Sequence, residues 1–166
     1  MEHHYTTQNA YKTADNELRH NVIAESVEDA EDYFIYAKNS LLSVNNWKQY
    51  SSSITASFEL INNNGYVLHR HAHMGDNIRI SAPGNLVYRL HIDTIVYDDY
   101  PDTDTESITM YLSRPESSIT EAPCIILVER SGIHIAAACT GVEEIAPLPE
   151  EQLHELVTGF INFDEQ

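Results

Sequence analysis

Three histidines alternate along residues 69–73, and a β-strand would place all of them on one face. Neutral imidazole is a common protein ligand for zinc, iron, copper and nickel, so the spacing is typical of a metal or ligand surface. His69 and His73 would lie about 13 Å apart along a straight strand, too far to share one ion. A metal site would therefore use His71 and His73, with a further ligand from elsewhere.

The turns on either side of these histidines predict the face that they occupy. Residues 54–60 alternate apolar and polar side chains, and turn-forming residues follow at 62–65 and again at 74–77. An even-length loop at either turn places the histidines on the apolar face. Odd-length loops at both turns would place them toward solvent instead. We take the even-length alternative, which predicts an apolar pocket edged by Phe58, His69, His71 and Tyr88.

The rest of the chain predicts helix, then sheet, then helix. Ser26 precedes apolar residues at helical spacing, with Asp29 as its capping partner, and a second helical segment is expected around Trp47. From about residue 53 to 141, strand-like segments alternate with turns, which favours antiparallel pairing. The predicted fold class is α+β: N-terminal helical segments, a curled antiparallel sheet or open barrel, and a short C-terminal helix beginning at Pro149.

Length and patterning predict one domain. The chain has 166 residues, of which 42% are hydrophobic, enough to bury one core. Residues 1–24 are polar without a sustained period, so we expect an N-terminal arm that is ordered only if it docks. Residues 25–162 would form the single α+β domain, and residues 163–166 a C-terminal tail.

Charge limits the partners of this chain. Its 26 acidic and 9 basic residues give a formal net charge of −17, which repels phosphate backbones and anionic lipid headgroups. We therefore expect no nucleic-acid or membrane partner, and leave a homodimer open. The N-terminus lacks the pattern of a secretion signal, so a cytoplasmic location is expected. The acidic run at 98–106 lacks the glycine of a calcium loop, which predicts a solvated loop.

The two cysteines flank residues 131–132, which predict the turn of a β-hairpin. A two-residue loop at 131–132 places Cys124 opposite Cys139 at a hydrogen-bonded pair, where the wide backbone separation suits a disulfide poorly. We expect both cysteines to be reduced and buried. The same register places Glu129 opposite His134 as a solvated surface pair.

One short segment resembles the first motif of the cupin family. Gly65, His71-Ala72-His73, Asn77 and Gly84 reproduce the spacing of that motif, although Asn77 stands where the family has a ligand glutamate. The second motif is missing, and His91 is the nearby histidine that would substitute for its ligand. The resemblance implies a cupin-like β-barrel and a metal-dependent enzyme that binds one divalent transition metal through His71, His73 and His91.

Two broader resemblances bear on the fold. Several segments look like an uncharacterised family of bacterial domains of similar length, which brings no activity; they are residues 40–42, 46–47, 58–60, 75–80, 83–84, 114–115 and 141–144. The order of a helical pair, an antiparallel sheet and a terminal helix is also similar to START-like ligand-binding domains.

The motifs of common enzymes are missing from this sequence. There is no Gly-rich phosphate cradle, no Gly-x-Ser-x-Gly elbow and no Cys-x-x-Cys. We therefore favour a non-enzymatic module, without a cofactor, that binds a small apolar ligand. The alternatives are the cupin-like enzyme and an acidic protein-interaction domain.

Overall fold

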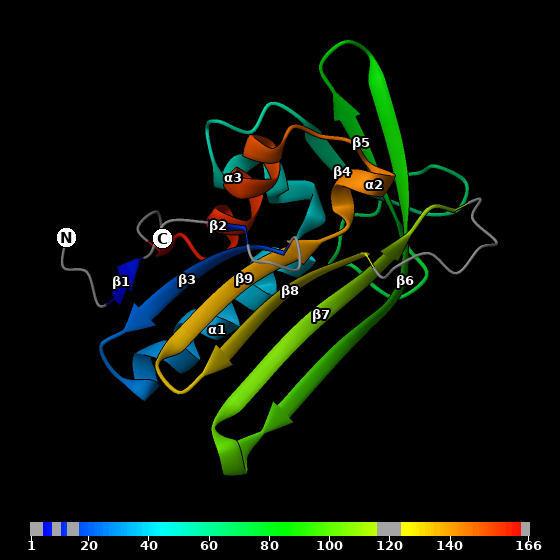
Figure 1. Cartoon of the computed structure of the whole chain (residues 1–166). Coiled ribbons are helices and arrows are strands. Elements are labelled where there is room, and N and C mark those ends of the chain that lie inside the picture. Colours follow the sequence, from blue (N-terminus) through cyan, green and yellow to red (C-terminus); the bar gives the residue numbers. More distant parts are fainter. Residues whose placement is uncertain (1–4, 8–10, 13–16, 116–123, 164–166) are drawn as a thin grey trace.

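The computed structural model describes residues 5–7, 11–12, 17–115 and 124–163, which form one antiparallel sheet with helices packed against one face (Figure 1). The elements in chain order are β1 (Tyr5–Thr7), β2 (Tyr11–Lys12), β3 (Leu18–Ala24), α1 (Val27–Leu42), the 3₁₀ helix η1 (Val44–Tyr50), β4 (Ser57–Ile61), β5 (Asn77–Ala82), β6 (Leu86–Tyr100), the 3₁₀ turn η2 (Pro101–Thr103), β7 (Thr105–Ser113), β8 (Cys124–Ser131), β9 (His134–Thr140), α2 (Val142–Ile145) and α3 (Glu150–Phe160).

Helix α1 begins and ends where side chains satisfy its backbone. The Ser26 side chain accepts a hydrogen bond of 3.0 Å from the Asp29 backbone N–H, as the sequence predicts. At the other end, the Ser43 backbone N–H donates to the Asn39 carbonyl at 3.0 Å, and the chain turns into η1. The two predicted N-terminal helical segments are thus confirmed.

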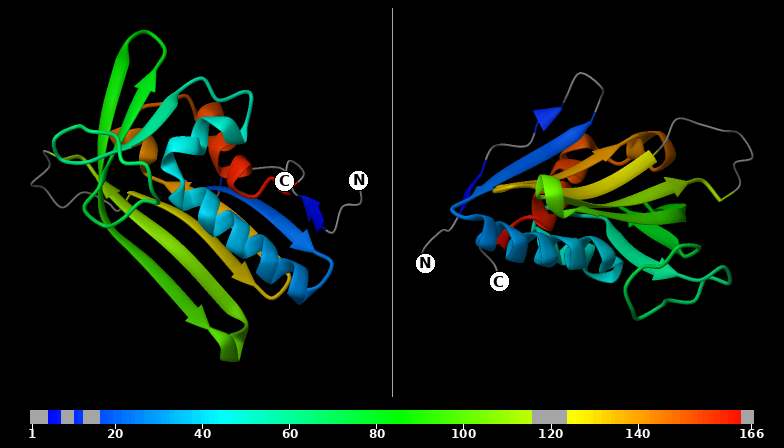
Figure 2. Two further views of the ribbon diagram at one scale, coloured as in Figure 1. Left: turned by 180° about the vertical axis from the view of Figure 1, so that it is seen from behind. Right: turned by 90° about the horizontal axis from the view of Figure 1, so that it is seen from below.

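The sheet is open and strongly twisted (Figure 2). Its strand order is β1-β3-β9-β8-β7-β6-β5-β4, with β2 paired to β3. The strands β4 to β9 follow one another as a meander, whereas β3, which precedes α1, joins the free side of β9. This order confirms the predicted α+β fold with a curled sheet and a short terminal helix. The described strands do not close into the cupin-like barrel that was the alternative.

The predicted N-terminal arm is wrong for residues 18–24, which form strand β3 inside the sheet. Leu18, His20, Val22 and Ala24 are buried toward the helices, so burial outweighs the polar composition of this segment. The remaining arm residues that the structure describes add two short strands on β3. Residues 1–4, 8–10 and 13–16 lie outside the described residues.

The predicted C-terminal tail is also wrong at its first residue. Phe163 is buried and stacks on Tyr33 of α1, with ring centroids 4.5 Å apart. Tyr5 of β1 meets both rings edge-on at 5.4 Å. Aromatic contacts therefore bring the two ends of the described chain together on α1. Residues 164–166 lie outside the described residues.

The hairpin of β8 and β9 is shifted from the predicted register. Ser131 pairs with His134, so the turn is Gly132-Ile133, and Gly132 adopts the left-handed conformation at φ 59°. Cys139 consequently pairs with Ile126 and not with Cys124. Both cysteines are buried and free of a disulfide, as expected. The predicted pair of Glu129 with His134 is wrong, because Glu129 lies opposite Ala136.

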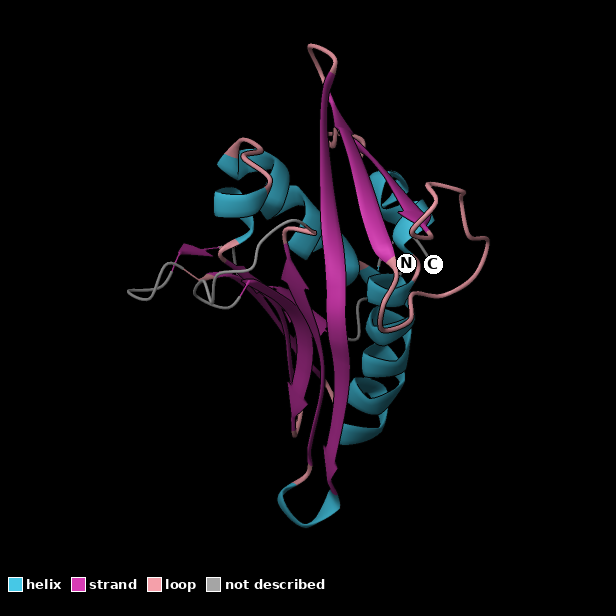
Figure 3. Cartoon of the chain, turned by 90° about the vertical axis from the view of Figure 1, so that its right-hand side faces the viewer, coloured by secondary structure: helices cyan, strands magenta, loops and turns pink. Residues whose placement is uncertain are grey.

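Strand β6 is the longest of the sheet, with 15 residues, and runs the full height of the molecule in Figure 3. Its first part pairs with β5, and its second part pairs with β7. A β-bulge between Ile92 and Thr94 separates the two parts.

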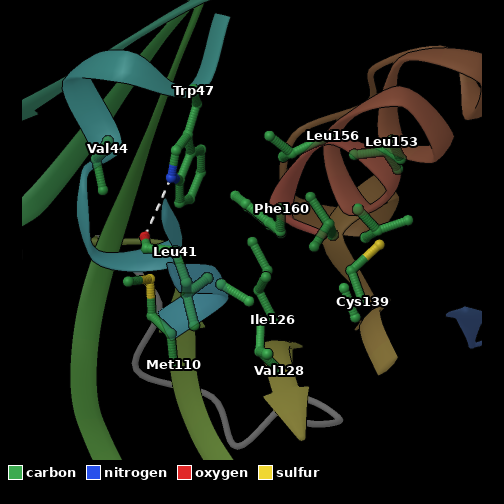
Figure 4. Packing of buried hydrophobic residues seen from close by; sticks show 14 of the residues in the cluster. Leu41, Val44, Trp47, Met110, Ile126, Val128, Cys139, Leu153, Leu156 and Phe160 are labelled. Carbon is green, nitrogen blue, oxygen red and sulfur yellow. Dashed lines mark hydrogen bonds between the residues drawn. The ribbon is translucent and has the colours of Figure 1, made fainter. Parts of the chain in front are cut away.

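The hydrophobic core lies between the sheet and the helices α1, η1 and α3 (Figure 4). Trp47 of η1 is buried, and its indole N–H donates to the Leu41 carbonyl at 3.1 Å. Its ring meets Phe160 of α3 edge-on at 5.4 Å. The sequence prediction that Trp47 serves packing is thus confirmed.

Candidate functional site

The three alternating histidines lie in a loop, not in a strand. Strand β4 pairs directly with β5, with Phe58 opposite Ile80. Residues 62–76 between them form a loop that touches β4 again only through a bridge of Val67 with Ile61 and a hydrogen bond of Leu68 with Leu60. His69, His71 and His73 are all exposed. The predicted histidine strand and its inward face are therefore wrong, because residues 69–73 form no strand and β4 pairs with the next strand, β5, instead.

An ion pair gives this histidine loop, residues 62–76, its shape. The Arg70 guanidinium donates to both carboxylate oxygens of Asp76, at 2.6 and 3.0 Å, and the His73 backbone N–H donates to the same carboxylate at 2.8 Å. Burial alone would raise the pKa of Asp76, but the hydrogen bonds and the charge of Arg70 outweigh it and hold that pKa below its ordinary value. The Ala72 backbone N–H donates to the Leu42 carbonyl at 2.9 Å, so Ala72 is buried between two exposed histidines.

The other predicted site residues lie apart from the histidine loop's exposed side chains. Phe58 is buried against Trp47, with ring centroids 5.3 Å apart, and belongs to the core. Tyr88 of β6 is half-buried and pairs with Ile80 of β5. Phe58 and Tyr88 thus belong to the core or pack against it, whereas His69 and His71 are exposed.

His91, the substitute ligand of the cupin-like alternative, lies beside Asn77 of β5 and Asp93 of its own strand, β6. Its Nδ1 lies 3.0 Å from the Asn77 side-chain oxygen, and its Nε2 lies 4.0 Å from a carboxylate oxygen of Asp93. Within the described part of the chain, no three His, Cys, Asp or Glu side chains are grouped as ligands of a metal ion.

A hollow of about 460 Å³ opens on the sheet near the β6–β7 and β8–β9 turns. In β3 the buried residues alternate with Arg19, Asn21 and Ile23, which therefore face away from the helices and line this hollow. We call it the outer hollow. Its remaining lining residues are Tyr100, Thr105, Glu106, Ser107, Glu129, Arg130, Ser131, His134, Ile135 and Ala136.

The charges around the outer hollow compensate one another. Arg19 of β3 forms ion pairs with Glu17, at 3.1 Å, and with Glu129 of β8, on the far side of β9. Arg130 is only 5% exposed and donates to Glu106 at 2.7 Å and to Asp104 at 3.0 Å. A buried guanidinium with these partners is a structural group, because removing either partner would leave a buried charge unpaired.

Uncharged polar groups and one aromatic ring complete the outer hollow. Ser131 and His134 are exposed where the β8–β9 turn begins and ends. Tyr100 is 58% exposed at the end of β6. A ring face and several groups that donate and accept hydrogen bonds therefore border the hollow. Sequence reasoning missed it because residues 17–24 were predicted to be an arm, although the alternation of Leu18, His20 and Val22 signals a strand.

Two further histidines, neither singled out by the sequence, face each other between β3 and α3. His20 is 7% exposed; its Nδ1 and the Nε2 of His154 are buried without a hydrogen-bond partner in the described part of the protein. Burial, and then the proximity of His154, lower the pKa of His20 below its ordinary value. Both effects favour the neutral form of His20.

The fold and the outer hollow define an α+β protein with one open antiparallel sheet and a polar depression on it. Comparison of the chain with family models, with curated proteins and with solved structures finds no match. Among the described residues, no helix is both long enough and apolar enough to span a membrane.

Proposed function

We propose that the protein is a non-enzymatic binding module whose outer hollow takes a small, neutral, hydroxyl-rich molecule such as a saccharide. The observation that carries this proposal is the hollow of about 460 Å³, lined by mutually compensated charges and bordered by an exposed tyrosine ring. Its size is in the range of small-molecule sites. A polar ligand thus replaces the apolar one that the sequence suggested.

The electrostatics support a neutral ligand. An anion would meet the Glu129 carboxylate in the lining and a net charge of −17 over the whole chain. A cation would meet the Arg19 guanidinium, whereas Arg130 and Glu106 bond each other on the helix side of the sheet. A hydroxyl group both donates and accepts, so it matches a wall in which an Arg19 guanidinium and a Glu129 carboxylate alternate with hydroxyl groups.

Tyr100 supports a ligand with a flat apolar face. Its ring is at the rim of the hollow and 58% exposed, and the apolar face of a sugar ring would cover it. Such a contact adds area without adding charge. Specificity would then come from the polar groups on the floor.

The test is a titration of the full chain with glucose, maltose and lactose, followed by amide chemical shifts in NMR spectra. We expect at least one sugar to shift the signals of Asn21, Ser131 and His134 at millimolar concentration, and sodium acetate not to do so. Tyr100→Ala should weaken this binding about fivefold through the lost stacking contact.

Tyr66→Ala is the matched control, because Tyr66 is 71% exposed in the histidine loop and should leave sugar binding unchanged. The proposal is overturned if no sugar shifts these signals, or if acetate shifts them as strongly. It is also overturned if both tyrosine variants weaken binding equally.

A further inference from the structure

The second part of β6 has a neighbouring strand on one side only, although β6 is not the last strand of the sheet. Strand β5 pairs with β6 only as far as His91, and the backbone of Ile92 exchanges two 2.8 Å hydrogen bonds with Gly75 and Asp76 of the histidine loop. From Thr94 to Tyr100 the described residues that pair with this strand belong to β7 alone, and Asp93 is the extra residue at the bulge. We call residues 93–100 the open edge; they form the lower half of the long strand in Figure 3.

The open edge has backbone groups available for another strand. An antiparallel strand bonds each neighbour with alternate residues, so half of the N–H and C=O groups at 93–100 point away from β7. The strand at the end of the sheet differs. In β4, the Leu60 N–H donates to the Asn45 side chain at 2.8 Å, and the Leu60 carbonyl accepts from the Leu68 N–H at 2.8 Å. The outer side of β4 is thus partly covered at Leu60, whereas the described residues place no such partner on the side of β6 from Thr94 to Tyr100.

The side chains of the open edge select the occupant by charge. Asp93, Asp98 and Asp99 give it three carboxylates, and Asp93 and Asp99 are exposed. A second copy paired here would set carboxylates against carboxylates, which is destabilising across a strand pair. A segment with lysine or arginine would instead form attractive cross-strand pairs.

An apolar contact is available beside these charges. Tyr97 is 49% exposed on the helix side of β6, and the Lys38 ammonium of α1 lies 5.3 Å from its ring centroid. This ring thus already accepts a cation in the free protein. Ile95, one residue pair further along the same face, is half-buried. An extended partner would therefore meet Ile95 and Tyr97 on this face, followed by the carboxylates of Asp98 and Asp99 towards the end of the strand.

We propose that the open edge, Asp93–Tyr100, binds an extended basic segment of another protein by strand addition. Main-chain hydrogen bonds would supply affinity, and the aspartates would supply selectivity for lysine and arginine. The bulge at Ile92 and Thr94 ends the added ladder, because the histidine loop occupies the next position. The open edge meets the outer hollow at one residue, Tyr100, which ends the edge and also lines the hollow.

The test uses a labelled peptide of alternating lysine and valine, followed by fluorescence anisotropy and by amide exchange of the full chain. We expect binding that weakens with added salt, together with slower exchange of amides within residues 93–100. The matched peptide of alternating glutamate and valine should not bind. The basic peptide N-methylated at two neighbouring central residues keeps its charge, loses donors in either register, and should bind at least about tenfold more weakly.

Charge reversal in the protein distinguishes binding at the open edge from attraction of the peptide by the overall negative charge. The double variant Asp98→Lys/Asp99→Lys should weaken the basic peptide at least about tenfold. The matched double variant Glu31→Lys/Asp32→Lys, with the same change of charge on exposed positions of α1, should leave binding within about twofold. Equal binding of the N-methylated peptide, or unprotected amides at 93–100, would overturn the proposal. So would self-association of the protein through this edge in sedimentation.

Discussion

Replacing Gly159 with alanine should destabilise the protein, although alanine is the better helix former. Gly159 lies in α3 where this helix packs against Tyr50 of η1. A Cβ atom at position 159 would lie 2.7 Å from the Tyr50 Cβ and 3.2 Å from the Tyr50 carbonyl oxygen. Carbon atoms at rest in a core are about 3.5–4 Å apart. The added methyl group therefore forces the two helices apart.

Two opposing effects set the size of this change. Alanine in place of glycine stabilises a helix interior by about 0.5–1 kcal/mol, and less near the last turn, where Gly159 lies. Overpacking a close contact costs about 1–3 kcal/mol. The atoms in conflict belong to the Tyr50 backbone and its Cβ, not to the mobile end of a side chain, so a rotamer change cannot relieve them. We expect a net loss of about 1–2 kcal/mol in the free energy of unfolding.

Urea unfolding followed by circular dichroism measures this loss. Thr158→Ala is the matched control, since it tests helix propensity in the same turn without a new atom against Tyr50. We expect Gly159→Ala to lower the unfolding midpoint with an unchanged slope, and Thr158→Ala to leave it the same or raise it. A Gly159→Ala variant as stable as the original chain would refute the claim that the contact of η1 with α3 decides this position.

Two further predictions concern the remaining buried polar contacts. Burial lowers the pKa of His20 below its ordinary 6.5, so the unfolded chain takes up a proton on this histidine at a higher pH than the folded chain does. The contribution of neutral His20 to the free energy of unfolding is therefore full above about pH 6.5. It falls on acidification by up to about 1.4 kcal/mol per pH unit. Thermal unfolding between pH 7 and 5 should show a flatter dependence for His20→Leu than for the original chain, and an equally steep one would contradict this assignment. Asn45→Ala should cost about 2 kcal/mol by leaving the Leu60 N–H without its acceptor. Asn46→Ala, at an exposed neighbour, should be nearly neutral in the same measurement, and equal losses would contradict this assignment.

Local chemistry made most of the secondary structure predictable. Residues close together in the chain are sufficient to recognise the Ser26 cap and the apolar face of α1. The same is true of the alternation in β4 and the amphipathic pattern of α3. These signals depend on neighbours in the chain. They were therefore sufficient for the element types and for the α+β class.

The direction of the histidines was not predictable, because it depends on which strands pair. The alternation of His69, His71 and His73 is equally compatible with a strand and with an extended loop. Because β4 pairs directly with β5, the histidines lie in the loop between these strands. The ion pair of Arg70 with Asp76 stabilises that loop. The apolar pocket inferred from that register therefore does not form from these residues.

The sequence by itself determined the acidic surface, the single core and the order of helix, sheet and helix, because composition and short-range periodicity are properties of the chain alone. Only the tertiary structure decided that β3 joins β9, which creates the outer hollow and buries His20 against His154. It also decided that β5 ends before β6 does, which leaves the open edge at Asp93–Tyr100. Both outcomes are contacts between segments distant in sequence, and a local pattern carries no information about which distant partner a strand will find.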